Sequence, residues 1–244
     1  MSRHELSPAR VKGTASRLVD IAGEKFRALD RDKPHPRSTE ELEWDRFLRM
    51  QWGPISEEWH AFRSAGGRLP LIENLIGQWL GNTGAWEGGV LVAWGLTSTA
   101  LAQHFPVTLG ALARIPGLRS ALWSVLAPGA EIPEHRGPNP GVLRFHLGVD
   151  CPEGAALGLE SKSVPFRNGE TVLFDDTEPH SSANRSDRER VTLFCEVLRP
   201  LPTPWKQLNK ATQDLLAIRP QSRARLSRAN AWNIALNPHL TAPA

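Results

Sequence analysis

The sequence predicts a mainly β protein whose jelly-roll-like core carries helices at its N-terminal and C-terminal ends. Residues 142–149 alternate with the period of a strand, so that Arg144 and His146 share one face while apolar side chains occupy the other. Further strand-like runs of apolar and β-branched residues cover 121–126, 171–174 and 190–194. The dipeptide Asn168-Gly169 marks a short turn between two of them. Short strands joined by short turns are typical of a compact antiparallel β architecture.

The chain is predicted to have three regions. These are a helical N-terminal region over 1–110, the β core over 111–204 and a C-terminal helical extension over 205–244. Pro200, Pro202 and Pro204 follow the last predicted strand, so they are expected to end the barrel and to start a helix over 205–218. The final stretch, 230–238, is expected to tuck against the barrel.

Two helices are predicted before the core. Apolar residues at helical intervals indicate a helix over 11–29, which ends before the two prolines of the 30–36 loop. A second helix is predicted over 39–50, with Ser38 as its N-cap and Glu41 as the capping-box partner. The nine tryptophans are expected to pack mainly inside the fold rather than to form a binding platform.

The composition excludes several classes of protein. With 244 residues, 40% of them hydrophobic, the chain can bury one substantial core. A net charge of +3 without a dense basic face argues against a nucleic-acid partner. The basic stretch 219–228 predicts a solvated helix face, and peripheral contact with anionic lipid is left open. Two cysteines and a charged start without an apolar segment lead us to expect a cytoplasmic protein.

One long run of the chain carries no Lys, Arg, Asp or Glu. It lies between Glu87 and Arg114, and Gly95 and Pro106 interrupt it. Its apolar pieces are shorter than the ~20 residues that cross a bilayer, so no transmembrane segment is expected and the run is predicted to be buried or to face an interface. For a lipid substrate, this run is where an acyl channel is expected.

Histidines and arginines with suggestive spacing follow this run. Two neutral imidazoles on neighbouring strands can hold one metal ion and leave other positions open, and His135 and His180 each lie beside a strand-like run. Arg190, ten residues beyond His180, could reach back into the barrel and hold a carboxylate in a bidentate pair. A non-haem iron oxygenase with a dicarboxylate cosubstrate such as 2-oxoglutarate fits this pattern.

From about Arg119 to Pro200 the chain resembles the catalytic domain of the aspartyl/asparaginyl β-hydroxylases. The resemblance rests on five elements in order: His135-x-Gly137, Leu143-Arg144-x-His146-Leu147-Gly148, Phe174-Asp175-Asp176-Thr177, His180 and Arg190. It implies a double-stranded β-helix of the cupin type and an Fe(II)- and 2-oxoglutarate-dependent dioxygenase that uses molecular oxygen.

The resemblance also implies a role for each site residue. His135 and His180 would be the metal ligands. Arg190, helped by the hydroxyl of Ser124, would grip the distal carboxylate of 2-oxoglutarate, and His146 would contact the other end of this cosubstrate.

Arg144 would face both cosubstrate and substrate near the metal, where its guanidinium could meet a substrate carboxylate or phosphate. In the aspartyl-hydroxylating members a basic residue stands two positions before this arginine, and here that residue is Val142. An aspartyl substrate would therefore lose a charge-assisted contact worth roughly 1.5–3 kcal/mol. The resemblance thus favours a small molecule, an amino acid or a lipid acyl chain as substrate over an aspartyl residue in a protein.

The usual iron site adds a carboxylate two residues after the first histidine, where this chain has Gly137. Glycine offers no ligand, and the same vacancy allows halide binding in some unrelated oxygenases. Asp175 and Asp176 are two nearby acids, but successive strand residues point to opposite faces, so at most one can face the interior. The other is expected to cap the turn over 177–179 or to support the site indirectly.

Hydroxylation of an unactivated C–H bond is the function that these observations favour. Four alternatives stay open: aspartyl or asparaginyl hydroxylation of a peptide or carrier-bound residue, halogenation, a catalytically silent cupin-like metal-binding sensor, and an unrelated β protein whose histidines have no metal.

Overall fold

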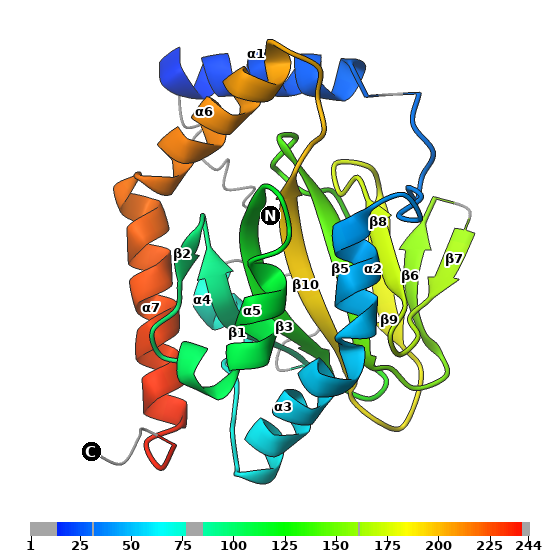
Figure 1. Ribbon diagram of the computed structural model, residues 1–244, viewed down its shortest axis with the longest axis vertical. Coiled ribbons are helices and arrows are strands. Elements are labelled where there is room, and N and C mark those ends of the chain that lie inside the picture. The colour runs from blue at the N-terminus through cyan, green and yellow to red at the C-terminus, as the bar shows by residue number, and fades with distance from the viewer. Residues whose placement is uncertain (1–13, 31, 77–84, 161, 241–244) are drawn as a thin grey trace, which may run out of the picture.

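Two antiparallel sheets face each other in the computed structural model, which describes residues 14–30, 32–76, 85–160 and 162–240 (Figure 1). The helices are α1 (Thr14–Ala28), α2 (Glu43–Met50), α3 (Trp52–Ser64), α4 (Ile72–Ile76), the 3-10 turn η1 (Ala102–His104), α5 (Pro106–Leu112), α6 (Trp205–Ala217) and α7 (Pro220–Leu236). The strands are β1 (Trp86–Ala93), β2 (Leu96–Thr97), β3 (Leu118–Leu126), β4 (Glu131–His135), β5 (Val142–Asp150), β6 (Ala155–Leu159), β7 (Lys162–Pro165), β8 (Thr171–Phe174), β9 (His180–Asn184) and β10 (Arg190–Leu198).

The larger sheet has the strand order β2-β1-β3-β10-β5-β8, and the smaller one has the order β4-β9-β6-β7. Strands far apart in the sequence are neighbours, because β10 lies between β3 and β5 and pairs with both in antiparallel register. The chain crosses between the sheets repeatedly, which is how a jelly roll is wound. The predicted double-stranded β-helix with terminal helices is confirmed.

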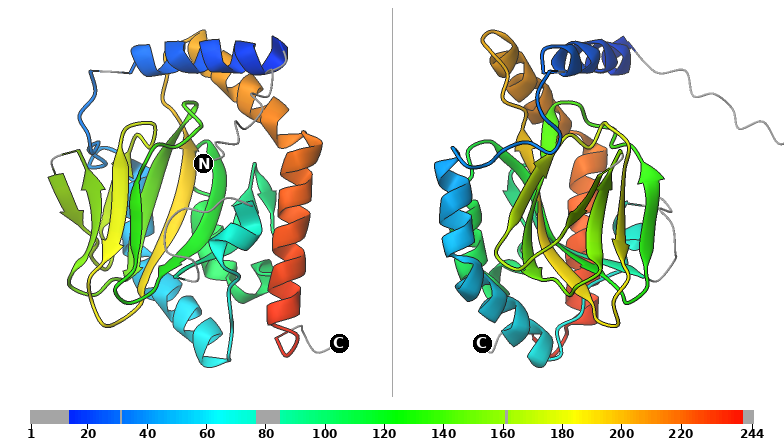
Figure 2. Two further views of the ribbon diagram at one scale, coloured as in Figure 1. Left: turned by 180° about the vertical axis from the view of Figure 1, so that it is seen from behind. Right: turned by 90° about the vertical axis from the view of Figure 1, so that its right-hand side faces the viewer.

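The alternation of side chains along the strands separates a packed face from a cavity face. Trp123, Phe145 and Leu193 are fully buried on the outer face of the larger sheet, where α2, α3 and α5 cover them. Trp59 of α3 meets Trp123 with ring centroids 5.0 Å apart, so these two tryptophans pack in the core as predicted. The opposite face looks toward the smaller sheet, as the right-hand view of Figure 2 shows.

The N-terminal region differs from the prediction in two ways. The second helix begins at Glu43, and its N-cap is Leu42 with no side-chain capping bond, so Ser38 is not the cap. The reason is tertiary: the Arg37 amide donates to the Leu173 carbonyl at 2.8 Å, which holds the preceding chain against β8. Strands β1 and β2 also lie before residue 111, within the region predicted to be mainly helical. Residues 11–13 of the first predicted helix lie outside the described residues.

The C-terminal extension follows the prediction closely. Helix α6 ends at Ala217, one residue before the predicted end, and the exposed side chains of Arg223 and Arg228 lie on α7. Asn237 anchors the end of α7 to the body of the protein, since it exchanges hydrogen bonds of 2.7 and 2.9 Å with the backbone of Arg68. Within the described ranges, no helix is long and apolar enough to cross a membrane.

Candidate functional site

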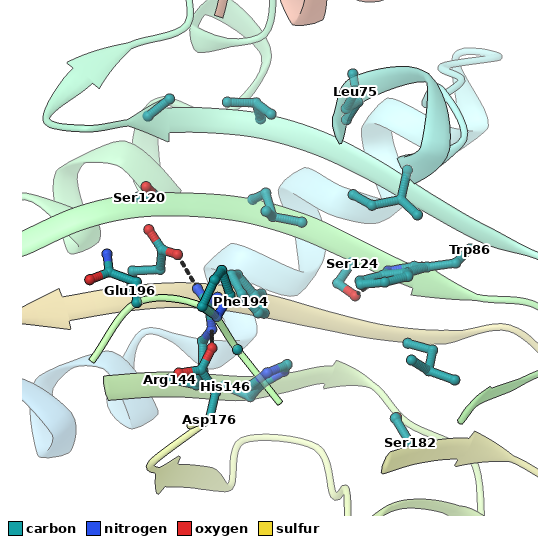
Figure 3. A pocket seen from close by; sticks show the side chains of 18 of the residues that line it. Leu75, Trp86, Ser120, Ser124, Arg144, His146, Asp176, Ser182, Phe194 and Glu196 are labelled. Carbon is teal, nitrogen blue, oxygen red and sulfur yellow. Dashed lines mark hydrogen bonds and ion pairs between the residues drawn. The ribbon is translucent and has the colours of Figure 1, made fainter. Parts of the chain in front are cut away.

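A cavity of about 400 Å³ lies between the two sheets, and all six predicted site residues line it. The members predicted from the sequence are Ser124, His135, Arg144, His146, His180 and Arg190. They come from five strands of both sheets, and Figure 3 shows the part of this wall around Ser124, Arg144 and His146.

The two predicted metal ligands lie side by side. His135 at the end of β4 and His180 at the start of β9 are register partners, and their ring centroids are 4.1 Å apart. Nδ1 of His135 lies 2.9 Å from the Pro133 carbonyl oxygen, and Nδ1 of His180 lies 3.0 Å from the Glu178 carbonyl oxygen. A carbonyl oxygen only accepts, so each Nδ1 must carry the hydrogen. Each Nε2 therefore keeps its lone pair for a metal.

Burial favours the neutral form of the His180 and His146 imidazoles. Burial, with smaller contributions from His135 and Arg144, lowers the pKa of His180 to about 4. Burial and the charges of Arg190 and Arg144 hold the pKa of His146 well below its ordinary value. Neutral imidazole is the form that binds a metal. In the part of the chain that the structure describes, no three His, Cys, Asp or Glu side chains gather as a metal site, so the cavity offers a pair of imidazoles.

Arg190 is a buried cation without a carboxylate partner in the described ranges. Its side chain is 1% exposed, and Nη1 donates to Thr192 Oγ1 at 2.9 Å and to Ser124 Oγ at 3.5 Å. Its Nε is buried and makes no hydrogen bond to the described residues. Burial lowers the pKa of Arg190 to about 10, so it stays charged at neutral pH. A buried charge requires a counter-charge, and an anion in the cavity would supply it.

Hydroxyl groups surround this arginine. Trp86 Nε1 donates to Ser124 Oγ at 2.9 Å, and this oxygen also accepts from Arg190, so the Ser124 hydroxyl hydrogen is left to point at another acceptor. Thr192 Oγ1 links Arg190 to Nδ1 of His146, which is 3.2 Å away. Trp86 and Thr192 were not among the predicted site residues, although Thr192 lies two residues from Arg190 on the same strand.

Arg144 faces the cavity as predicted, but two carboxylates already hold its guanidinium. Nε donates to Asp176 Oδ2 at 2.7 Å, and Nη1 donates to Glu196 (Figure 3). Burial alone would lower the pKa of Arg144, but these two acids raise it above its ordinary value. The Arg144 guanidinium, which was expected to bind a substrate carboxylate or phosphate, is therefore largely occupied by these two acids. Glu196 was missed, although it shares the cavity face of β10 with Arg190 by strand alternation.

The glycine at the missing carboxylate position has no room for a side chain. A Cβ on Gly137 would lie 1.7 Å from Asp176 Oδ2, and the Gly137 amide donates to the Asp176 carbonyl oxygen at 2.6 Å. Asp176 Oδ1 is buried and makes no hydrogen bond to the described residues. The Asp176 carboxylate thus occupies the space that the side chain of an aspartate at position 137 would need.

Replacing this glycine is expected to damage the site rather than to complete it. In Gly137→Asp the new side chain must displace the buried Asp176, so we expect a loss of roughly 1–3 kcal/mol in stability and no gain in metal affinity. Gly53→Asp is the matched control, because a Cβ there meets nothing within 4 Å. Thermal unfolding and metal titration of both variants would check this. Tighter metal binding by Gly137→Asp would contradict it.

The two consecutive aspartates divide their roles as predicted, although both follow the end of β8 and do not lie on a strand. Asp176 lines the cavity, whereas Asp175 Oδ1 accepts hydrogen bonds from the Thr177 amide at 3.0 Å and the Thr177 hydroxyl at 2.8 Å. The prediction that one member of the pair caps the turn over 177–179 is confirmed. Asp175 also pairs with Arg199, whose Nη2 lies 2.7 Å from Asp175 Oδ2.

Residues 49–200 match the model of a family described as aspartyl/asparaginyl beta-hydroxylase. Among relatives, the ornithine lipid ester-linked acyl 2-hydroxylase of Rhizobium tropici is 33% identical over 150 residues, which are 60% of this chain and 53% of the relative. The human aspartyl/asparaginyl beta-hydroxylase is 27% identical over 180 residues, 70% of this chain and 23% of the relative. The matches thus span about half or less of these relatives.

Solved structures give weaker matches. The DMSP lyase DddQ from Ruegeria pomeroyi DSS-3 aligns with a TM-score of 0.40 at 14% identity, over 80% of this chain and 76% of that one. A cupin 2 conserved barrel domain protein from Salinispora arenicola aligns with a TM-score of 0.32 at 14% identity, over 52% and 83% of the two chains.

Proposed function

Because this chain belongs to the aspartyl/asparaginyl β-hydroxylase family, we propose that it is an Fe(II)- and 2-oxoglutarate-dependent dioxygenase. Its substrate would be a small molecule, an amino acid or a lipid acyl chain, of which it hydroxylates an unactivated C–H bond. One observation carries the proposal: the guanidinium of Arg190, buried and without an acidic partner among the described residues, lines the same cavity as the neighbouring imidazoles of His135 and His180.

His135 and His180 would hold the iron through their Nε2 atoms. These atoms carry no hydrogen, because the imidazole hydrogen is on Nδ1, where it is donated to a backbone carbonyl. Arg190 and the hydroxyl of Ser124 would bind the distal carboxylate of 2-oxoglutarate, and neutral His146 would lie along its other end. When bound, iron and 2-oxoglutarate together supply the oxidative decarboxylation that activates oxygen for C–H hydroxylation. The chain itself positions the reactants and excludes water.

Asp176 favours hydroxylation over halogenation at this site. Its carboxylate lies where a ligand side chain at position 137 would start, two residues after His135. A negative charge there disfavours a halide ion and suits water, which can donate a hydrogen bond to Asp176 Oδ1, an atom that accepts none from the described residues. Arg144 holds Asp176 in this position.

Aspartyl side chains are disfavoured as substrates for a similar reason. Val142 is fully buried and does not reach the cavity, and Arg144 is already paired with Asp176 and Glu196. A substrate carboxylate near Arg144 would meet two acids and one arginine. The reacting part of the substrate is therefore expected to be uncharged.

Succinate formation from 2-oxoglutarate tests the proposal directly. Anaerobically purified, Fe(II)-loaded protein is exposed to oxygen, alone and with candidate amino acids and lipids. In Arg190→Lys the charge remains but the planar fork is lost, so we expect the KM for 2-oxoglutarate to rise roughly 10- to 100-fold. Arg188→Lys is the matched control, because Arg188 is an exposed arginine two residues away that pairs with Asp150.

Two results would count against this function. If the wild-type protein neither binds nor consumes 2-oxoglutarate with any candidate substrate, the metal-binding sensor becomes the better hypothesis. If Arg190→Lys and Arg188→Lys show the same KM for 2-oxoglutarate, Arg190 does not bind this cosubstrate.

A further inference from the structure

The cavity extends beyond the histidines and arginines into an apolar half. Side chains of α4, β1 and α7 form a separate hydrophobic cluster there, and its members Leu75, Trp86, Val90 and Ala229 also line the cavity. Figure 3 shows Leu75 and Trp86 on the side of the cavity away from Glu196 and Asp176. A cavity that has charged groups along one wall and apolar side chains along another suits a molecule with an apolar chain.

Helix α7 builds part of this wall, although it lies beyond the segment that defines the family. The family match ends at residue 200, whereas α7 spans Pro220–Leu236 and contributes Arg225, Leu226 and Ala229 to the cavity. The helix is fixed in place, because the Ser98 hydroxyl donates to Asn230 Oδ1 at 2.7 Å. The wall is therefore preformed.

The β1–β2 turn adds a tryptophan to the lining of the cavity. Trp94 and Gly95 form the two-residue turn, with φ values of 51° and 83°. This kind of turn prefers Asn-Gly, and a bulky residue with positive φ is strained. Strained residues are often retained where they serve a site. The half-buried Trp94 lines the cavity, so the turn positions an indole ring where it can contact a bound molecule.

The arginines that line the cavity differ in whether an acid neutralises them. Arg144 is neutralised by Asp176 and Glu196, and Arg136 pairs with Glu178. Arg225 is exposed at the cavity and makes no ion pair with the described residues. Among the described residues that line the cavity, Arg225 and the buried Arg190 are thus the arginines without an acidic partner.

We propose that the apolar half of the cavity binds an acyl chain whose anionic group contacts Arg225, so that α7 selects the substrate. This inference names the substrate class of the proposed hydroxylase. Only the oxidation of the acyl chain rests on the proposed function, and the binding of the acyl chain does not. The chain would lie along Leu226, Ala229 and the β1 side chains, with its reactive carbon toward the histidines. An uncharged carbon suits this part of the cavity, because Arg144 is already paired with Asp176 and Glu196.

Binding can be measured without any chemistry. Isothermal titration calorimetry on the metal-free protein of 244 residues compares dodecanoate with dodecyltrimethylammonium, which has the same chain length and the opposite charge. We expect the wild-type protein to prefer dodecanoate. Arg225→Glu is expected to weaken dodecanoate binding roughly five- to tenfold, and to reduce or reverse this preference. Arg228→Glu is the matched control, because Arg228 is exposed on the same helix and does not line the cavity.

A second pair of variants tests the apolar wall. Leu226→Asp places a charge on the lining and is expected to weaken dodecanoate binding at least about tenfold. Ile234→Asp, at a position 51% exposed on the same helix and outside the cavity, should leave binding unchanged. Circular dichroism of each variant separates lost binding from lost folding, and Arg225→Glu is a surface change that the fold should tolerate.

The outcomes separate this inference from the proposed function. Dodecanoate binding that depends on Arg225 and Leu226, in a protein that forms no succinate, would support the acyl site and count against the dioxygenase. Succinate formation in a protein that does not bind dodecanoate, or that binds it equally in all four variants, would overturn the acyl site and leave the dioxygenase intact. Stronger binding of dodecyltrimethylammonium than of dodecanoate would also overturn it.

Discussion

His180→Ala is expected to abolish iron binding and, with it, succinate formation. Changing a group that hydrogen-bonds a metal ligand typically costs 10- to 100-fold in metal affinity or activity, and removing one of the two proposed imidazole ligands should cost more than that. The site has no third protein ligand to compensate, because the cavity offers two imidazoles within the described residues. His135→Ala should behave in the same way, since His135 and His180 are register partners on adjacent strands.

The measurement is the iron content after anaerobic desalting, together with a cobalt(II) titration that does not depend on turnover. His60→Ala is the matched control, because its side chain is 56% exposed and lies against Asp150 rather than in the cavity. A His180→Ala protein that keeps full iron content would place the metal elsewhere. Unchanged thermal unfolding of the variant would show that the loss concerns the metal and not the fold.

Arg199→Met is expected to cause the largest loss of stability. Arg199 is completely buried and donates to Asp30 Oδ2 at 2.9 Å and to the Pro140 carbonyl at 2.7 Å, while its Nη2 lies 2.7 Å from Asp175 Oδ2. Asp30 also pairs with Arg37 at 2.6 Å, so the cluster joins the end of α1 to β10 and to the turn before His180. Removing one member of a buried ion pair leaves an uncompensated charge and costs about 3–5 kcal/mol.

For a chain of this size, such a loss corresponds to a fall in Tm of roughly 6–20 °C. Lys210→Ala is the matched control: its pair with Asp214 is exposed and should contribute no more than about 1 kcal/mol. Differential scanning calorimetry of both variants measures the two Tm values to be compared with that of the wild-type protein. Equal Tm values for Arg199→Met and Lys210→Ala would show that the buried cluster is not needed for stability.

The same cluster predicts how stability depends on pH. Burial alone would raise the pKa of Asp175, but the charge of Arg199 and the hydrogen bonds from Thr177 lower it below its ordinary value. A carboxyl with a depressed pKa in the folded state stabilises the fold above its unfolded pKa of about 3.9. This contribution is lost as the pH falls through the lower, folded pKa.

Local patterns in the sequence were enough for much of the fold and of the cavity. The period of two along 142–149 placed Arg144 and His146 on one face, and the structure puts both in the cavity. The same alternation assigned the turn-capping role to one of the two aspartates, which is Asp175. The spacing of the prolines after β10 located the start of α6. These features depend on neighbours within a few residues along the chain, so a single sequence is enough to predict them.

Other features depended on contacts between distant segments. The N-cap predicted at Ser38 was wrong because Arg37 pairs with Leu173, a partner over a hundred residues away. The neutralisation of Arg144 by Asp176 and Glu196 required the pairing of β5 with β8 and β10.

The sequence by itself therefore determined the β architecture, the polar face and the residue types of the candidate site, because hydrophobic period and turn residues act locally. Only the tertiary structure decided which charges are paired and which stay free, as it leaves Arg190 and Arg225 without a counter-charge among the described residues. It also brought α7 against the cavity. Charge pairing and cavity walls depend on distances in space between strands and helices, and the order of residues along one chain does not contain those distances.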